Sequence, residues 1–191
     1  SLGEACWPSR LFSQTQYDNI EADDALNAVS VSVVGTANAS NTGDTTDVSV
    51  TTSAWVGQTY LQDNAENPTA VIVKAYVASG TVTMGCRIYR TSGGLPTGSP
   101  LSSGKVEVTV TTAAEVTINI ESHAPGAVYA ASSRTNAIVI YDTGETVGSG
   151  LKVRRGGTDY ADGQHVTSAD GGTTWAAGTG DMYFKTYMGG Y

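Results

Sequence analysis

The sequence IYRTSGGLPTGSPL, from Ile88 to Leu101, carries the strongest indication of fold in this 191-residue chain. Its first residues end a strand, because apolar and polar side chains alternate with a period of two up to this point. Val82, Met84, Cys86 and Ile88 fall on one face, and polar or aromatic residues fall on the other. The pattern is typical of a strand with one face in a core.

Glycine and proline dominate the second half of the same sequence. Gly93 and Gly94 can adopt backbone angles that are closed to other residues, whereas Pro96 and Pro100 fix φ and lack an N–H donor. We therefore expect an ordered loop that caps one end of a sheet. The loop contains no acid, general base or metal ligand, so it indicates architecture rather than chemistry.

The strand pattern recurs along the chain from Asp47 onward, and Ala137–Tyr141 is apolar on both faces, as a central strand is. Many short strands at this spacing predict an all-β fold, a two-sheet antiparallel β-sandwich of jelly-roll type. The expected strands are Val48–Thr52, Gly57–Gln62, Ala70–Val77, Thr81–Arg90, Lys105–Thr111, Glu115–Glu121, Asn136–Tyr141, Leu151–Arg155 and Met182–Tyr187. The residues expected to face the core are Val82, Met84, Cys86, Ile88, Val106, Val108, Val110, Val116, Ile118 and Ile120.

Residues 1–45 differ from this pattern and are expected to form an N-terminal arm, followed by a sandwich domain over residues 46–191. The arm has no clear period, so it cannot bury its own apolar residues and is expected to dock either onto its own sandwich or onto a partner. Cys6 lies in the arm and could be free, paired with Cys86, or paired with another subunit. The arm residues expected to contact partner subunits are Trp7, Leu11, Phe12, Tyr17 and Ile20.

Charge and hydropathy exclude two kinds of partner. The net charge is −8 and the pI is about 4.5, so we expect no binding of nucleic acid, which needs clustered Lys and Arg. We expect no contact with a membrane, because no apolar run is long enough to cross one. One basic cluster exists, at Lys152, Arg154 and Arg155; it is either an exposed strand face or a docking point for an acidic neighbour.

Motifs for catalysis are missing from the sequence. The two histidines, His123 and His165, lie in segments expected to be exposed loops, and no nucleophile elbow accompanies them. We therefore expect no enzymatic activity and no cofactor. Calcium is a weaker hypothesis: Asp159, Asp162 and Asp170 lie in Gly-rich turns and could converge, but Asp also closes such turns with its own side chain. Asp142 and Glu145 present the same two alternatives.

Aromatic residues gather near the C-terminal end of the sequence. Exposed aromatic rings beside polar groups are typical of sugar-binding surfaces. The candidate glycan-binding residues are Tyr160, Trp175, Tyr183 and Tyr187. Trp175 has an alternative role as a packing residue under its turn.

Three motifs, in order, resemble a β-sandwich module found in phage virion proteins and in bacterial surface proteins of the choice-of-anchor type. The first is Ile88–Leu101, which resembles the "SGGLPTGxPL" signature of that module. Ser168–Trp175 reads SADGGTTW and resembles its "S-x-D-G-G-x-T-W" turn. Asp181–Tyr187 resembles its closing strand, so the likeness spans roughly Thr51 to Tyr187.

The resemblance implies a non-enzymatic structural protein on the virion surface, most simply a capsid decoration or head-fibre protein of a phage. Its expected partners are major capsid or other virion subunits and further copies of itself in a homo-oligomer. A tail or baseplate subunit is one alternative. The other is a carbohydrate-binding module for a host-surface glycan. The module is grafted onto many proteins, so it indicates fold more strongly than function.

Overall fold

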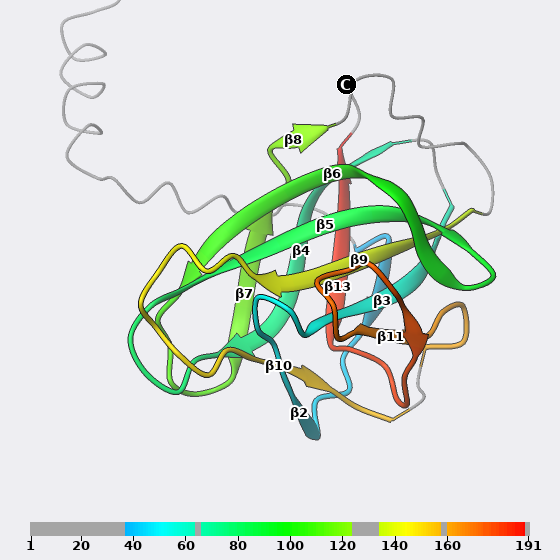
Figure 1. Cartoon of the computed structure of the whole chain (residues 1–191). Helices are drawn as coiled ribbons and strands as arrows, with labels where there is room; N and C mark the ends of the chain where they lie inside the picture. The colour runs from blue at the N-terminus through cyan, green and yellow to red at the C-terminus, as the bar shows by residue number, and fades with distance from the viewer. Residues whose placement is uncertain (1–36, 64–65, 124–133, 158–159, 190–191) are drawn as a thin grey trace, which may run out of the picture. The chain divides into compact units, whose positions relative to one another are not determined.

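A computed structural model describes residues 37–63, 66–123, 134–157 and 160–189 of the chain. Every regular element in these ranges is a β-strand, and the strands form two antiparallel sheets packed face to face (Figure 1), which confirms the predicted sandwich. The strands are β1 Ala39–Asn41, β2 Thr46–Ser49, β3 Trp55–Gln62, β4 Asn67–Tyr76, β5 Val82–Ser92, β6 Leu95–Val108, β7 Ala114–Asn119, β8 Ser122–His123, β9 Arg134–Asp142, β10 Lys152–Arg155, β11 His165–Ser168, β12 Ala176–Ala177 and β13 Phe184–Gly189.

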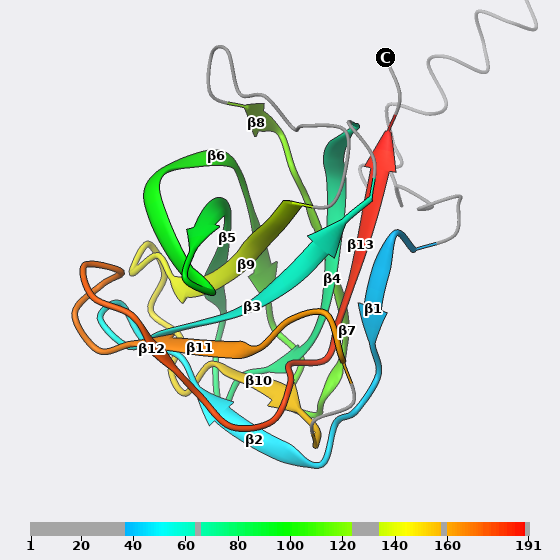
Figure 2. The same cartoon turned by 90° about the vertical axis from the view of Figure 1, so that its right-hand side faces the viewer.

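The first sheet is built around β4 and has the order β1-β13-β4-β10-β2. Strand β13 pairs with the first part of β4, and β10 takes over on the same side at Ala75 and Tyr76. Strand β7 pairs with the opposite side of β4, from Ala70 to Ala75. Figure 2 shows β13, in red, between β4 and β1.

The second sheet has the order β12-β11-β3-β9-β5-β6-β8, and Figure 1 shows β6, β5, β9, β3 and β11 following one another. Its longest element is the β5–β6 hairpin. Gly93 and Gly94 form the turn, with φ of 60° and 77°. The expected capping loop is shorter than predicted, because β6 resumes at Leu95 and runs through Pro96, which pairs with Thr91 across the hairpin.

The main core lies between the two sheets and holds most of the residues predicted from alternation. Val106 and Val116 are half-buried against it, and Lys105 and Glu107 are exposed as expected. Val110 was placed wrongly: it is 39% exposed, because β6 ends at Val108 and the chain turns there. The predicted residues that are buried are Val82, Met84, Cys86, Ile88, Val108, Ile118 and Ile120.

Cys86 is a free, fully buried thiol, and burial raises its pKa. Its side chain packs in the core as a small hydrophobe, as its place in the alternation predicts. Cys6 lies outside the described residues.

The sandwich begins earlier than residue 46. Strand β1 belongs to the range predicted as arm, yet it pairs with β13. The Thr186 hydroxyl accepts the N–H of Ala39, and the side-chain amide of Asn41 donates to the carbonyl of Met182. The remaining arm, including the five residues predicted to contact partners, lies outside the described residues. In the described ranges, no helix has the length and apolar character needed to span a membrane.

Replacing Ile118 with Ala tests this core. Ile118 is 0% exposed, so its truncation should leave a cavity and lower the free energy of unfolding by about 2–5 kcal/mol. Val110→Ala is the matched control, with an expected change below about 0.5 kcal/mol. Chemical denaturation measures both, and equal losses in the two variants would contradict the observed register.

Candidate functional site

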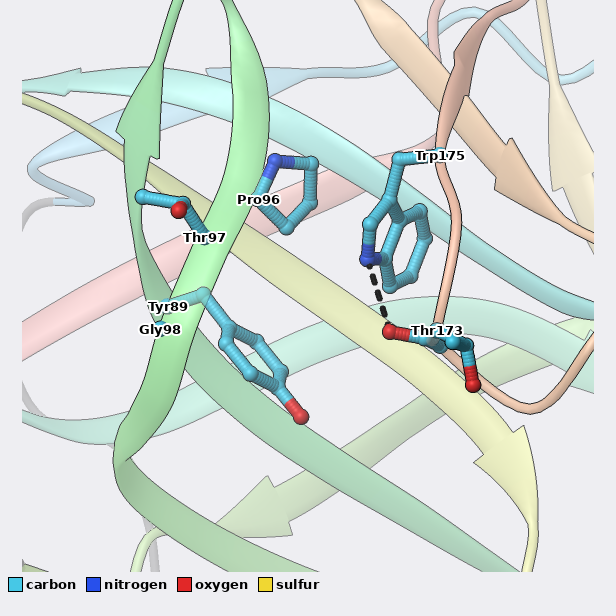
Figure 3. Close-up of a pocket in the computed structure, with 7 residues that line it drawn as sticks. Tyr89, Pro96, Thr97, Gly98, Thr173 and Trp175 are labelled. Carbon is cyan, nitrogen blue, oxygen red and sulfur yellow. Dashed lines mark hydrogen bonds between the residues drawn. The ribbon is translucent and has the colours of Figure 1, made fainter.

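A hollow of about 180 Å³ lies between the β5–β6 hairpin and the loop that follows β11 (Figure 3). We call it the hairpin–loop hollow. The hairpin belongs to the first of the three sequence motifs and the loop to the second, so residues of both motifs line the hollow. The hairpin contributes Tyr89, Pro96, Thr97 and Gly98, and the loop contributes Gly172, Thr173 and Trp175.

The hollow opens on the outer face of the second sheet. On β9, Ile138 and Ile140 belong to the main core, whereas Ala137 and Val139 belong to a second, smaller cluster. Because side chains alternate across a strand, this second cluster covers the opposite face of the sheet. Tyr89 is a buried member of it, and Trp175 packs against it half-buried.

Asp170 holds the loop in shape. Its carboxylate accepts the backbone N–H of Thr174 (2.8 Å) and of Thr173 (3.1 Å), and the hydroxyls of Ser168 (2.8 Å) and Thr174 (2.7 Å). These bonds, first of all those from Thr174, lower the pKa of Asp170 to about 2. Asp170 therefore closes its own turn, the second of the two roles that the sequence left open.

Gly172 brings the loop close to the sheet. Its φ is 84°, and a Cβ at this position would lie 2.6 Å from the Trp55 ring, so a side chain is excluded on both grounds. The indole N–H of Trp175 donates to the Gly172 carbonyl at 3.1 Å, which fixes the ring beside the hollow.

A stack of aromatic rings and a guanidinium group lies beside the loop. Trp55 and Tyr141 stack with centroids 4.6 Å apart, and the Arg87 guanidinium lies 4.6 Å from the Tyr141 centroid and 5.1 Å from that of Trp55. Sequence reasoning missed these three residues and Tyr89. The available signal was alternation, because each lies on the face of its strand opposite the main core.

Of the four residues predicted to bind glycan, only Trp175 lines the hollow. Tyr160 packs edge-on against Phe184 at 5.2 Å, and its hydroxyl accepts the N–H of Leu61. Tyr183 bonds Glu115, and Tyr187 lies on β13 in the first sheet. The sequence could not show that these residues lie at different places, because residues that are close along the chain need not be close in the folded structure.

The calcium hypothesis finds no support at Asp170, because that carboxylate is engaged in its own turn. Asp162 is exposed, and Asp159 lies outside the described residues. Within the part of the chain that the structure describes, no three His, Cys, Asp or Glu side chains are placed to hold a metal ion. Asp142 accepts the N–H of Gly144, and Glu145 pairs with Lys105 at 2.9 Å.

His165 is buried in β11, which corrects the expectation of an exposed loop. It is 3% exposed and lies under Gly178, where a Cβ would come 2.3 Å from the ring. Burial, and then the positive charge of Arg155, lower its pKa to about 4. Neither ring nitrogen has a hydrogen-bond partner among the described residues, so no nucleophile is paired with it there. His123 lies in the short strand β8.

The basic cluster on β10 is half-buried rather than an exposed strand face or a free patch of charge. Arg154 pairs with Asp47 at 2.7 Å, and the Lys152 ammonium lies 5.8 Å from the Tyr76 ring centroid. Arg155 donates to the carbonyl of Thr179. Each cation thus has a partner within the domain.

The lining of the hollow offers no acid, base or nucleophile paired for catalysis. Comparisons with protein-family models, curated proteins and solved structures find no match to this chain. Its function must therefore be argued from the site and from the motifs.

Stability should depend on pH through His165. Because its pKa is 6.5 ordinarily and about 4 here, the unfolded chain binds the proton more tightly. The contribution of neutral His165 to the free energy of unfolding is therefore complete above pH 6.5. The free energy of unfolding then falls by about 3 kcal/mol as the pH decreases to 4. Denaturation at pH 7 and pH 4 in the parent chain and in His165→Gln isolates this effect, since the variant should lose that part of the slope. The same slope in both chains would contradict it.

Asp170→Ala should loosen the loop. It removes the acceptor for the N–H groups of Thr173 and Thr174, so their amide hydrogen exchange should accelerate. Asp170→Asn keeps one side-chain oxygen as an acceptor and should restore part of the protection. Asp162→Ala, at an exposed aspartate of another turn, is the control and should leave both amides unchanged.

Proposed function

We propose that this chain is a non-enzymatic structural protein of a phage particle, a capsid decoration or head-fibre protein displayed at the virion surface. The observation that carries the proposal is that residues of the three sequence motifs have structural roles. Their functional groups are engaged in holding the sandwich together, as a display module requires. Asp170 closes its loop, and the buried carboxylate of Asp181 accepts the side-chain amide of Gln58 at 2.8 Å.

The motif residues also build the core of the sandwich. Phe184, from the third motif, is fully buried and contacts the rings of Tyr60 and Tyr160. The hairpin of the first motif and the loop of the second lie on either side of one hollow. A module whose signature residues are structural supports the virion resemblance better than it supports an enzyme.

Attachment to the particle is assigned to the N-terminal residues, up to residue 36. Apolar residues such as Trp7 and Phe12 have no periodic pattern that would make a core of their own. Aromatic side chains are the usual anchors of a protein interface. We therefore propose that this segment contacts capsid subunits and neighbouring copies of the chain.

Deletion of residues 1–36 tests attachment. The cut falls before Asn38, whose N–H donates to the Thr186 carbonyl, so the sheet containing β1 is preserved. The shortened chain should retain its β-sheet circular dichroism and its unfolding transition but fail to bind particles from the native source. In the full chain, Trp7→Ala with Phe12→Ala should weaken binding, and Tyr187→Ala should not. Absence of the protein from purified particles would contradict the proposal. Binding by the shortened chain would contradict the role of the N-terminal residues and show that the interface lies on the sandwich.

A further inference from the structure

We infer that the hairpin–loop hollow is a binding site for one neutral sugar ring of a surface glycan. Structural display alone requires no ligand, so this goes beyond the proposed function. The site lies on well-defined elements of the sandwich and uses none of the N-terminal residues assigned to attachment.

Aromatic and pyrrolidine rings form the walls. Figure 3 shows Tyr89 and Pro96 on the hairpin side, facing Trp175 on the loop side. A pyranose ring has an apolar C–H face and a polar rim of hydroxyl groups. Tyr89 and Pro96 are buried, so the half-buried Trp175 ring is the surface that the apolar face of the sugar would contact, and a small number of placed polar groups fix its orientation.

Hydroxyl groups supply the polar contacts. Thr97 and Thr173 are exposed at the edge of the hollow, and a hydroxyl both donates and accepts hydrogen bonds. The Thr173 hydroxyl donates to the Asp170 carbonyl at 3.0 Å, so its oxygen remains available only as an acceptor. No charged side chain lines the hollow, which favours a neutral ligand over an acidic sugar.

The size of the hollow suits a single ring. Its volume of about 180 Å³ is well below the range of roughly 300–1,000 Å³ found for pockets that enclose a drug-sized molecule. The rim is open at Gly98, where an added Cβ would meet no atom within 4 Å. The remaining units of a glycan can leave through that opening. An extended proline-rich peptide would instead need a long groove.

The walls are held in place before any ligand arrives. The Trp175 ring is fixed by its bond to Gly172, and Asp170 closes the loop that carries it. Tyr89 is held in the outer cluster with Ala137 and Val139. Preformed walls reduce the entropic cost of binding.

The test uses the full chain and an array of neutral, N-acetylated and acidic glycans, followed by calorimetric titration with the neutral glycans that bind. Trp175→Ala should weaken binding about tenfold or more. Trp175→Phe keeps an aromatic face without the bond to Gly172 and should retain more affinity than the Ala variant. Thr97→Val removes a lining hydroxyl from the hairpin without touching the Asp170 turn, and it should weaken binding. Tyr187→Ala, an aromatic change in the first sheet, is the control and should bind as the parent chain does.

Binding to neutral glycans that depends on Trp175 supports the inference, provided that the variants keep the parent unfolding transition. No binding on the array, binding to acidic glycans alone, or equal binding by Trp175→Ala overturns it. Binding of a proline-rich peptide, and not of glycan, at this hollow also overturns the inference. A negative result here leaves attachment to particles standing, because that assay uses a different surface and a different readout.

Discussion

Burial of β9 on both faces is the constraint on which the rest of the structure depends. Ile138 and Ile140 fill the main core, and Ala137 and Val139 point to the other side of the same sheet, where they are equally buried. An apolar outer face has to be covered, since water would otherwise contact it. The cover is made by aromatic side chains and by the loop that carries Trp175, so the hollow is a consequence of this second layer of packing.

Buried polar groups hold the covering elements to the sheets. The Gln58 side chain lies on β3 in the second sheet and is fully buried. Its amide donates to Asp181, and its carbonyl oxygen accepts the N–H of Met182. A buried amide left unpaired would be costly, so this network fixes how the segment before β13 passes the second sheet. On the outer face, the exposed Asp170 carboxylate instead holds only its own turn in shape.

This division of roles is the one that the proposed display function requires. The core and the polar networks make the sandwich a fixed support, and the exposed ion pairs of the acidic surface, such as Lys105 with Glu145, lie at its periphery. Exposed ion pairs of this kind contribute little to stability. Their number therefore says less about the fold than the apolar contacts between the sheets do.

Local patterns in the sequence located the longer strands and most of their inward faces, but not the short strands β1, β8, β11 and β12. Alternation located Met84, Cys86 and Ile88 in the core, because a strand has a period of two whatever it pairs with. The same period specifies neither which strand lies beside which nor where a strand ends. Tertiary structure alone therefore decided that Tyr89 and Trp175 share one hollow and that His165 is buried. It also decided that β1 joins the sheet, because its pairing with β13 links segments from opposite ends of the chain through contacts that only the packed sheets create.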